Sequence, residues 1–90
     1  NNLWLDDLGS GKRVLLTPHE GTASVDGRFG ADTRTVFVVH NLGLDHSVLA
    51  RIDIGEDGTP SKPTTLASRD GIELEDFEIA DDRLSGVLVW

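Results

Sequence analysis

The sequence contains no cysteine and no methionine, and only five of its side chains are Phe or Trp. Without cysteine the chain has no disulfide, no thiolate nucleophile and no cysteine-based zinc site. This absence fits the cytoplasm and the periplasm equally. Because Met is missing even at position 1, we expect a processed or excised piece of a longer chain.

Basic residues are also scarce: eight Lys and Arg stand against 16 Asp and Glu, a formal net charge of −8. Nucleic acid and anionic membrane surfaces are therefore poor candidate partners. No run of 18 apolar residues occurs, which excludes a transmembrane helix. With 90 residues, of which 38% are hydrophobic, we expect one small soluble globular domain.

The chain resembles itself when shifted by 46 to 50 residues. At a shift of 50, Leu16 meets Leu66 and the segment Phe37-Val38-Val39 meets Val87-Leu88-Val89. Near the amino end a shift of 46 aligns better, and the four-residue difference falls in the turn at 56–60, where an insertion costs little. We interpret this pattern as an internal repeat.

The apolar runs are too short for the helices of a helical repeat, and they are rich in β-branched residues. Strands are predicted at Arg13–Thr17, Thr35–Val39, Val48–Ile54, Pro63–Ala67 and Val87–Trp90. Within the third run, the set Leu49, Arg51 and Asp53 alternates with Ala50, Ile52 and Ile54, as in a half-buried strand. The segment 68–74 is interpreted as a loop, and Gly9–Gly11 and Gly43–His46 as hairpin turns. Four short strands per repeat indicate an all-β fold built from β-propeller blades, each a four-stranded antiparallel sheet.

The order of these segments is similar to the WD-like repeat of TolB-type propellers and of the prolyl oligopeptidase family of serine peptidases. The resemblance rests on four segments: Leu15-Leu16-Thr17-Pro18, Phe29-Gly30-Ala31-Asp32, Val36-Phe37-Val38-Val39 and Leu49-Ala50-Arg51-Ile52-Asp53. They correspond to the family's "LT" strand end, its "FSPDG" inner strand and turn, an apolar strand and an "L-x-x-I/L-D" strand. The motifs depart from the family pattern: Gly30-Ala31 replaces Ser-Pro, Thr33 and Arg83 replace the turn Gly, and Ala67-Ser68 replaces Thr-Pro.

The resemblance implies a single propeller segment of about two blades' worth, with a half blade at each end. Residues 1–20 are expected to hold the third and fourth strands of one blade, 23–67 a complete blade, and 72–90 the first two strands of the next. What one end lacks the other end carries, so identical copies could close into a ring.

No catalytic, cofactor or metal site is predicted in this chain. Peptidases of the family carry Ser on a G-x-S-x-G elbow in a separate hydrolase domain; Gly9-Ser10-Gly11 is interpreted as a hairpin turn instead. His19, His40 and His46 lack metal-ligand spacing, and surface or loop histidine is the favoured interpretation. The segment Asp53–Gly58 lacks calcium ligands at the required positions and is interpreted as another turn.

The acidic stretch 70–82 supplies the only candidate site. The structural interpretation is solvated surface charge that aids solubility. The functional interpretation is that some of these acids line a propeller channel or rim and attract or repel peptide termini. The candidate channel or rim acids are Glu73, Glu75, Asp76, Asp81 and Asp82. Trp4 and Trp90 are expected in blade cores or interfaces.

Three hypotheses of function remain open. The first is a non-catalytic segment of a prolyl oligopeptidase-like peptidase that limits substrate access to a hydrolase domain outside this chain. The second is a protein- or peptide-binding propeller with no enzyme attached. The third is a self-associating fragment that closes a symmetric propeller. The expected partners are the remaining blades and hydrolase domain of a parent chain, or identical copies.

Overall fold

The computed structural model describes residues 2–18, 25–80 and 85–90, and the regular structure in these ranges consists of strands. The eight strands are β1 (Trp4–Asp6), β2 (Arg13–Leu15), β3 (Val25–Phe29), β4 (Thr35–His40), β5 (Val48–Asp53), β6 (Thr64–Ala67), β7 (Asp76–Ile79) and β8 (Gly86–Val89). All pairings between named strands are antiparallel. The predicted all-β class with antiparallel sheets is therefore confirmed.

The strands form a four-stranded meander in the order β3-β4-β5-β6 and two separate hairpins, β1-β2 and β7-β8. In the meander, Val38 lies opposite Ala50 and Val36 opposite Ile52. Glycines with positive φ serve the turns: Gly43 between β4 and β5, and Gly58 between β5 and β6. At these positions a Cβ would meet the steric penalty of the left-handed region.

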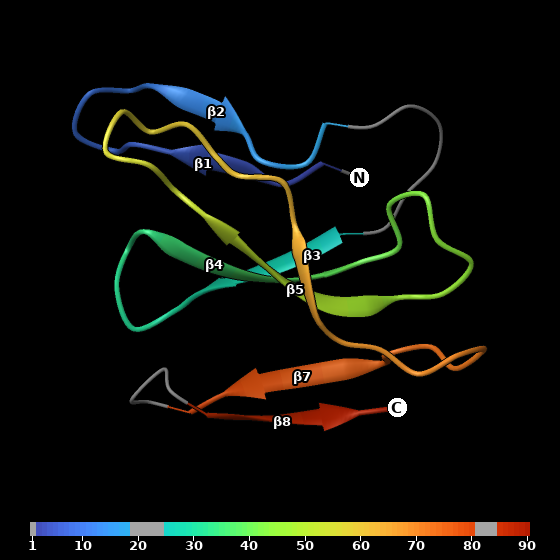
Figure 1. Ribbon diagram of the computed structural model, residues 1–90. Helices are drawn as coiled ribbons and strands as arrows, with labels where there is room; N and C mark the ends of the chain where they lie inside the picture. The colour runs from blue at the N-terminus through green and yellow to red at the C-terminus, as the bar shows by residue number, and fades with distance from the viewer. Residues whose placement is uncertain (1, 19–24, 81–84) are drawn as a thin grey trace.

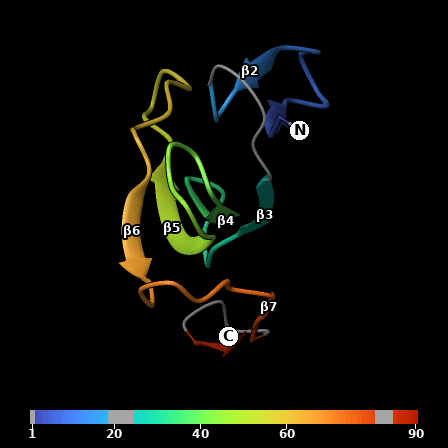
Figure 2. The same ribbon diagram turned by 90° about the vertical axis from the view of Figure 1, so that its right-hand side faces the viewer.

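The three sheets stack as layers. The β1-β2 hairpin lies on one side of the meander and the β7-β8 hairpin on the other (Figure 1). The view turned by 90° shows the same order, with the segment after β6 passing beneath the meander to reach β7 (Figure 2). Each face of the central sheet therefore has one hairpin against it.

Side-chain alternation gives each face its own hydrophobic cluster. The first cluster lies beneath β1-β2 and consists of Leu16, Val25, Val36, Val38, Ala50, Ile52 and Ile54, with Leu3, Leu5, Val14 and Leu42 packed against it. The second lies against β7-β8 and has Leu49, Leu74 and Phe77 as its buried members. The predicted alternation in β5 is confirmed: Leu49 belongs to the second cluster, and Ala50 and Ile52 to the first. Because all three side chains are buried, the strand is buried on both faces and not half-buried.

The observed strands differ from the predicted ones mainly at their ends. The first strand is short because the Asp7 side chain accepts hydrogen bonds from the backbone N–H groups of Gly9 and Ser10, which turns the chain. The segment 68–74, interpreted as a loop, contains one isolated bridge, Arg69 to Ile72. The described residues form no helix long and apolar enough to cross a membrane.

Candidate functional site

Glu73 is held against the β4–β5 loop. Its carboxylate accepts the backbone N–H of Ser47 at 2.8 Å. This hydrogen bond is the main cause that lowers the pKa of Glu73 below its ordinary value, and nearby His46 adds a smaller contribution in the same direction. The side chain therefore ties the segment before β7 to the central sheet.

Glu75 and Asp76 lie where β7 begins, and both are exposed. The Glu75 backbone N–H donates to the carbonyl of Val89, and the Asp76 carboxylate accepts the N–H of Phe77 at 2.8 Å. Asp76 shares the outer face of the β7-β8 hairpin with Glu78, because Phe77 between them points to the second cluster. The predicted set is thus divided: Glu73 bonds to the central sheet and Asp76 faces outward. Asp81 and Asp82 lie outside the described residues.

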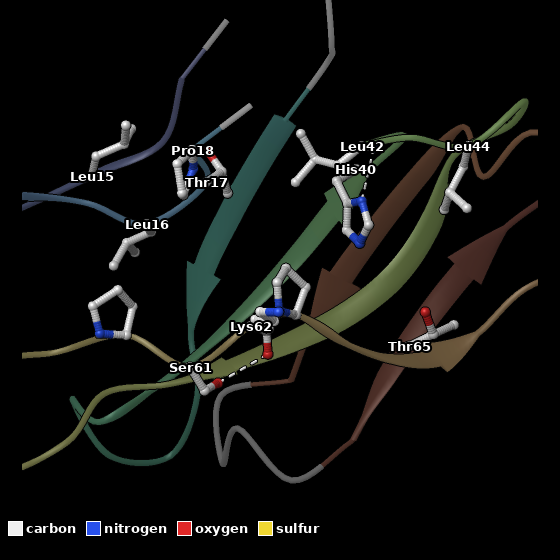
Figure 3. Close-up of a pocket in the computed structure, with 12 residues that line it drawn as sticks. Leu15, Leu16, Thr17, Pro18, His40, Leu42, Leu44, Ser61, Lys62 and Thr65 are labelled. Atoms are coloured by element: carbon white, nitrogen blue, oxygen red, sulfur yellow. Dashed lines mark hydrogen bonds between the residues drawn. The ribbon is translucent and has the colours of Figure 1, made fainter. Parts of the chain in front are cut away.

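A pocket of about 540 Å³ lies between the end of β2, the β4–β5 loop and the segment that leads into β6 (Figure 3). Much of its wall is apolar. Its lining residues are Leu15, Leu16, Thr17, Pro18, His40, Leu42, Leu44, Pro60, Ser61, Lys62, Pro63 and Thr65. The β1-β2 hairpin lies toward β3 and β4, where a second, smaller pocket is bounded by Leu3, Gly27 and Val36. The side of this face near the start of β6 is therefore left open.

His40 is the most unusual polar group in this pocket. It ends β4 and is only 5% exposed, so its interpretation as a surface or loop histidine is wrong. Its Nδ1 accepts the backbone N–H of Leu42 at 3.0 Å, whereas Nε2 is buried without a hydrogen-bond partner. Burial lowers the pKa of His40 below its ordinary value, which keeps the ring neutral.

The alternation of β4 could have revealed His40. Val36, Val38 and His40 occupy every second position and are all buried. Metal-ligand spacing carries no signal for this burial. His46 lies in the β4–β5 loop and is partly buried, and His19 lies outside the described residues.

The other candidate motifs have structural roles. Residues 54–60 form a tight turn closed by the Ile54–Pro60 bridge, and the Asp57 carboxylate accepts the N–H of Thr59. Ser10 lies in the β1–β2 turn, where its Oγ accepts the N–H of Lys12. Within the described ranges no cluster of three or more His, Asp or Glu side chains is arranged to hold a metal ion.

The two tryptophans occupy different environments. Trp4 is 47% exposed on the outer face of β1, with the Arg13 guanidinium 5.7 Å from its ring centre. Trp90 packs against the second cluster, and Arg69 lies 5.6 Å from its ring centre. Trp90 is thus partly buried beside a hydrophobic cluster, whereas the outer face of β1 leaves Trp4 open to a further contact.

No protein-family model, curated protein or solved structure matches this chain.

Proposed function

We propose that this chain is a segment of a β-propeller in which β3–β6 form one blade and the two hairpins belong to the blades on either side. The observation that carries the proposal is the stacking of a four-stranded antiparallel meander between two antiparallel hairpins. In a propeller, each blade is such a meander and packs face to face with its neighbours. The strand pairing agrees with the division into residues 1–20, 23–67 and 72–90.

The segment is proposed to be a non-catalytic part of a serine peptidase resembling the prolyl oligopeptidase family. The motif positions support this: Leu16-Thr17 directly follows β2, Phe29 ends β3 and Leu49–Asp53 lies within β5. In this role the segment limits the access of large substrates to a hydrolase domain outside the chain. Because fold alone does not define function, this part rests on the motif resemblance.

The acidic residues acquire a specific role in this proposal. The first strand of a blade is the one nearest the central channel, and β7 is the first strand of its proposed blade. Glu75 and Asp76 at its start are therefore the described candidates for channel or rim acids. Glu73 is the weaker candidate, since its carboxylate is engaged by Ser47.

Self-association is a second candidate function, favoured by the hairpins themselves. Each hairpin is a two-stranded sheet, half as wide as the central meander, and in the described residues β1 and β8 pair with one strand each. Their outer faces expose Trp4, Val87 and Val89. Such edges and faces promote association, so a second copy could complete each half sheet.

A serine-reactive fluorophosphonate probe tests the peptidase proposal. The polypeptide that contains these 90 residues is purified natively from its source, labelled, and analysed by tryptic peptide mass spectrometry. We expect the label on a serine within a G-x-S-x-G elbow outside residues 1–90, and heat-denatured protein is the control. A parent polypeptide that takes no label and carries no such elbow contradicts the peptidase role and favours a binding module.

A further inference from the structure

The pocket beside His40 combines two features that independently point to a ligand. One is its size, which lies within the range of about 300–1,000 Å³ typical of small-molecule sites. The other is the Nε2 atom of His40, which is buried and has no partner. Buried polar groups in proteins are almost always hydrogen-bonded, so an unpaired one calls for an explanation.

The hydrogen bond at Nδ1 fixes what Nε2 can do. Because Nδ1 accepts the Leu42 N–H, the proton of the neutral ring must be on Nε2. Nε2 is therefore a donor, and the group that satisfies it must be an acceptor. Figure 3 shows the ring turned so that the bonded nitrogen lies toward Leu42 and the other toward the pocket.

The remaining wall determines the body of the ligand. Four leucines and three prolines form most of the wall, and the polar side chains of Thr17, Lys62 and Thr65 complete it. The Thr17 hydroxyl already accepts the backbone N–H of Leu3 at 3.1 Å. The Ser61 hydroxyl is already used, since it donates to the carbonyl of Lys62 at 3.1 Å. A ligand that fits has a mostly apolar body and an oxygen acceptor for the Nε2–H of His40.

We propose that this pocket binds a small, mostly apolar molecule through a carbonyl oxygen that accepts the Nε2–H of His40. The inference is independent of the propeller proposal, because it rests on the pocket and not on the stacking of blades. Nε2 is covered in the structure, so the oxygen reaches it when a lining side chain shifts. Leu44 in the β4–β5 loop is the exposed leucine of this wall.

Two probes of nearly the same shape test the proposal. Cyclohexanone carries the carbonyl oxygen, and methylenecyclohexane replaces that oxygen by carbon. The full 90-residue chain, labelled with ¹⁵N, is titrated with each probe by NMR, following the backbone amides around the pocket and the side-chain Nε2–H of His40. We expect saturable shifts with both probes, about threefold to tenfold tighter binding of cyclohexanone, and a downfield shift of the Nε2 proton with cyclohexanone alone.

Variants separate the hydrogen bond from the apolar contact. His40→Phe keeps a planar ring without the donor and is expected to abolish the difference between the probes. Leu44→Ser is expected to weaken both probes alike, and it tests the pocket even if His40→Phe fails to fold. Leu8→Ser is the matched control, because Leu8 is 95% exposed and does not line the pocket; its affinities should equal those of the unmodified chain.

The proposal is overturned if the unmodified chain shows no saturable shifts, or if both probes bind equally well. It is also overturned if the Nε2 proton responds to neither probe and only exchanges with water, since the nitrogen is then satisfied by solvent alone. Equal losses of affinity in Leu44→Ser and Leu8→Ser would likewise place binding elsewhere on the surface.

Discussion

The two faces of the central sheet are covered by hairpins of similar size, but different side chains fill the two interfaces. Beneath β1-β2 seven buried residues, all aliphatic, form the first cluster. Against β7-β8 only three residues are buried, and six partly buried side chains, including the aromatic rings of Phe37 and Trp90, complete the contact. Hydrophobic stabilisation scales with the apolar area removed from water. Packing against β1-β2 therefore contributes more to the free energy of unfolding, and β7-β8 is the layer that detaches more easily.

Arginines compensate in part on the weaker side. The Arg28 guanidinium of β3 lies 5.6 Å from the ring centre of Phe77 in β7, and Arg69 is placed similarly over Trp90. Each contact contributes about 0.5–1 kcal/mol at exposed sites. Two contacts of this size contribute less to stability than the apolar area buried in the first cluster.

The largest expected effect comes from truncating the first cluster. Ile52 is 0% exposed and Leu49, on the opposite face of the same strand, is 9% exposed. Ile52→Ala should lower the free energy of unfolding by about 3–4 kcal/mol and Leu49→Ala by about 2 kcal/mol. Urea denaturation at one fixed protein concentration measures both. An equal or larger loss in Leu49→Ala would contradict the conclusion that the β1-β2 face contributes more to stability.

The next largest loss of stability is expected at one of two glycines, Gly86 and Gly27, where an added Cβ would lie equally close to its nearest atom. A Cβ at Gly86 would lie 2.7 Å from the backbone carbonyl of Glu78, which cannot move without opening the hairpin. A Cβ at Gly27 would lie 2.7 Å from Leu3 Cδ2, the end of a flexible side chain. Gly86→Ala should therefore cost about 1–3 kcal/mol and Gly27→Ala less than about 1 kcal/mol. Amide hydrogen exchange in β7-β8 is the readout; faster exchange in Gly27→Ala than in Gly86→Ala would refute this argument.

A smaller effect depends on pH through His40. Its pKa in the folded chain is lowered from 6.5 by burial, so the unfolded chain takes up the proton first as the pH falls. The contribution of the neutral ring to the free energy of unfolding is fully present above about pH 6.5 and is lost progressively as the pH falls below that value. The unmodified chain should lose more stability between about pH 7 and about pH 5 than His40→Phe. Parallel denaturation curves at each pH test this, and identical losses would contradict it.

The smallest effect is expected at Glu73. Its folded pKa is lowered from 4.5, chiefly by the hydrogen bond from Ser47, so its contribution is present above that value and is lost as the pH falls through the lowered pKa. Glu73→Gln should lower the melting temperature slightly at about pH 7 and by less at about pH 3. Thermal melts of both proteins provide the comparison. A deficit of equal size at both pH values would show that the charge is not responsible.

Local patterns allowed most strands to be predicted from the sequence. The alternation of Leu49 and Ile52 on opposite faces of β5 followed from the two-residue period, and glycine marked the turn at Gly43. The period alone does not say whether a second layer covers a face, which is why Leu49 was expected on a half-buried strand. The burial of His40 was missed for a different reason: the period that puts it on the face of Val36 and Val38 was not applied to the histidines.

The lateral position of the first hairpin could not be predicted either. Aligned blades would place β1 and β2, the third and fourth strands of the resemblance, over β5 and β6. Instead Leu3 approaches Gly27 of β3, and the uncovered side becomes the pocket. Long-range packing decides this placement, and short segments carry no signal for it. The channel role of Glu75 and Asp76 stays a prediction.

We propose that both hairpins are halves of sheets that other strands complete. Light scattering of the purified chain, with an intact mass of every polypeptide present, is the measurement to make. We predict a homogeneous multiple of 9.7 kDa, three copies giving six blades and four giving eight, or a complex with a larger polypeptide. A monodisperse 9.7 kDa species that unfolds cooperatively would contradict it.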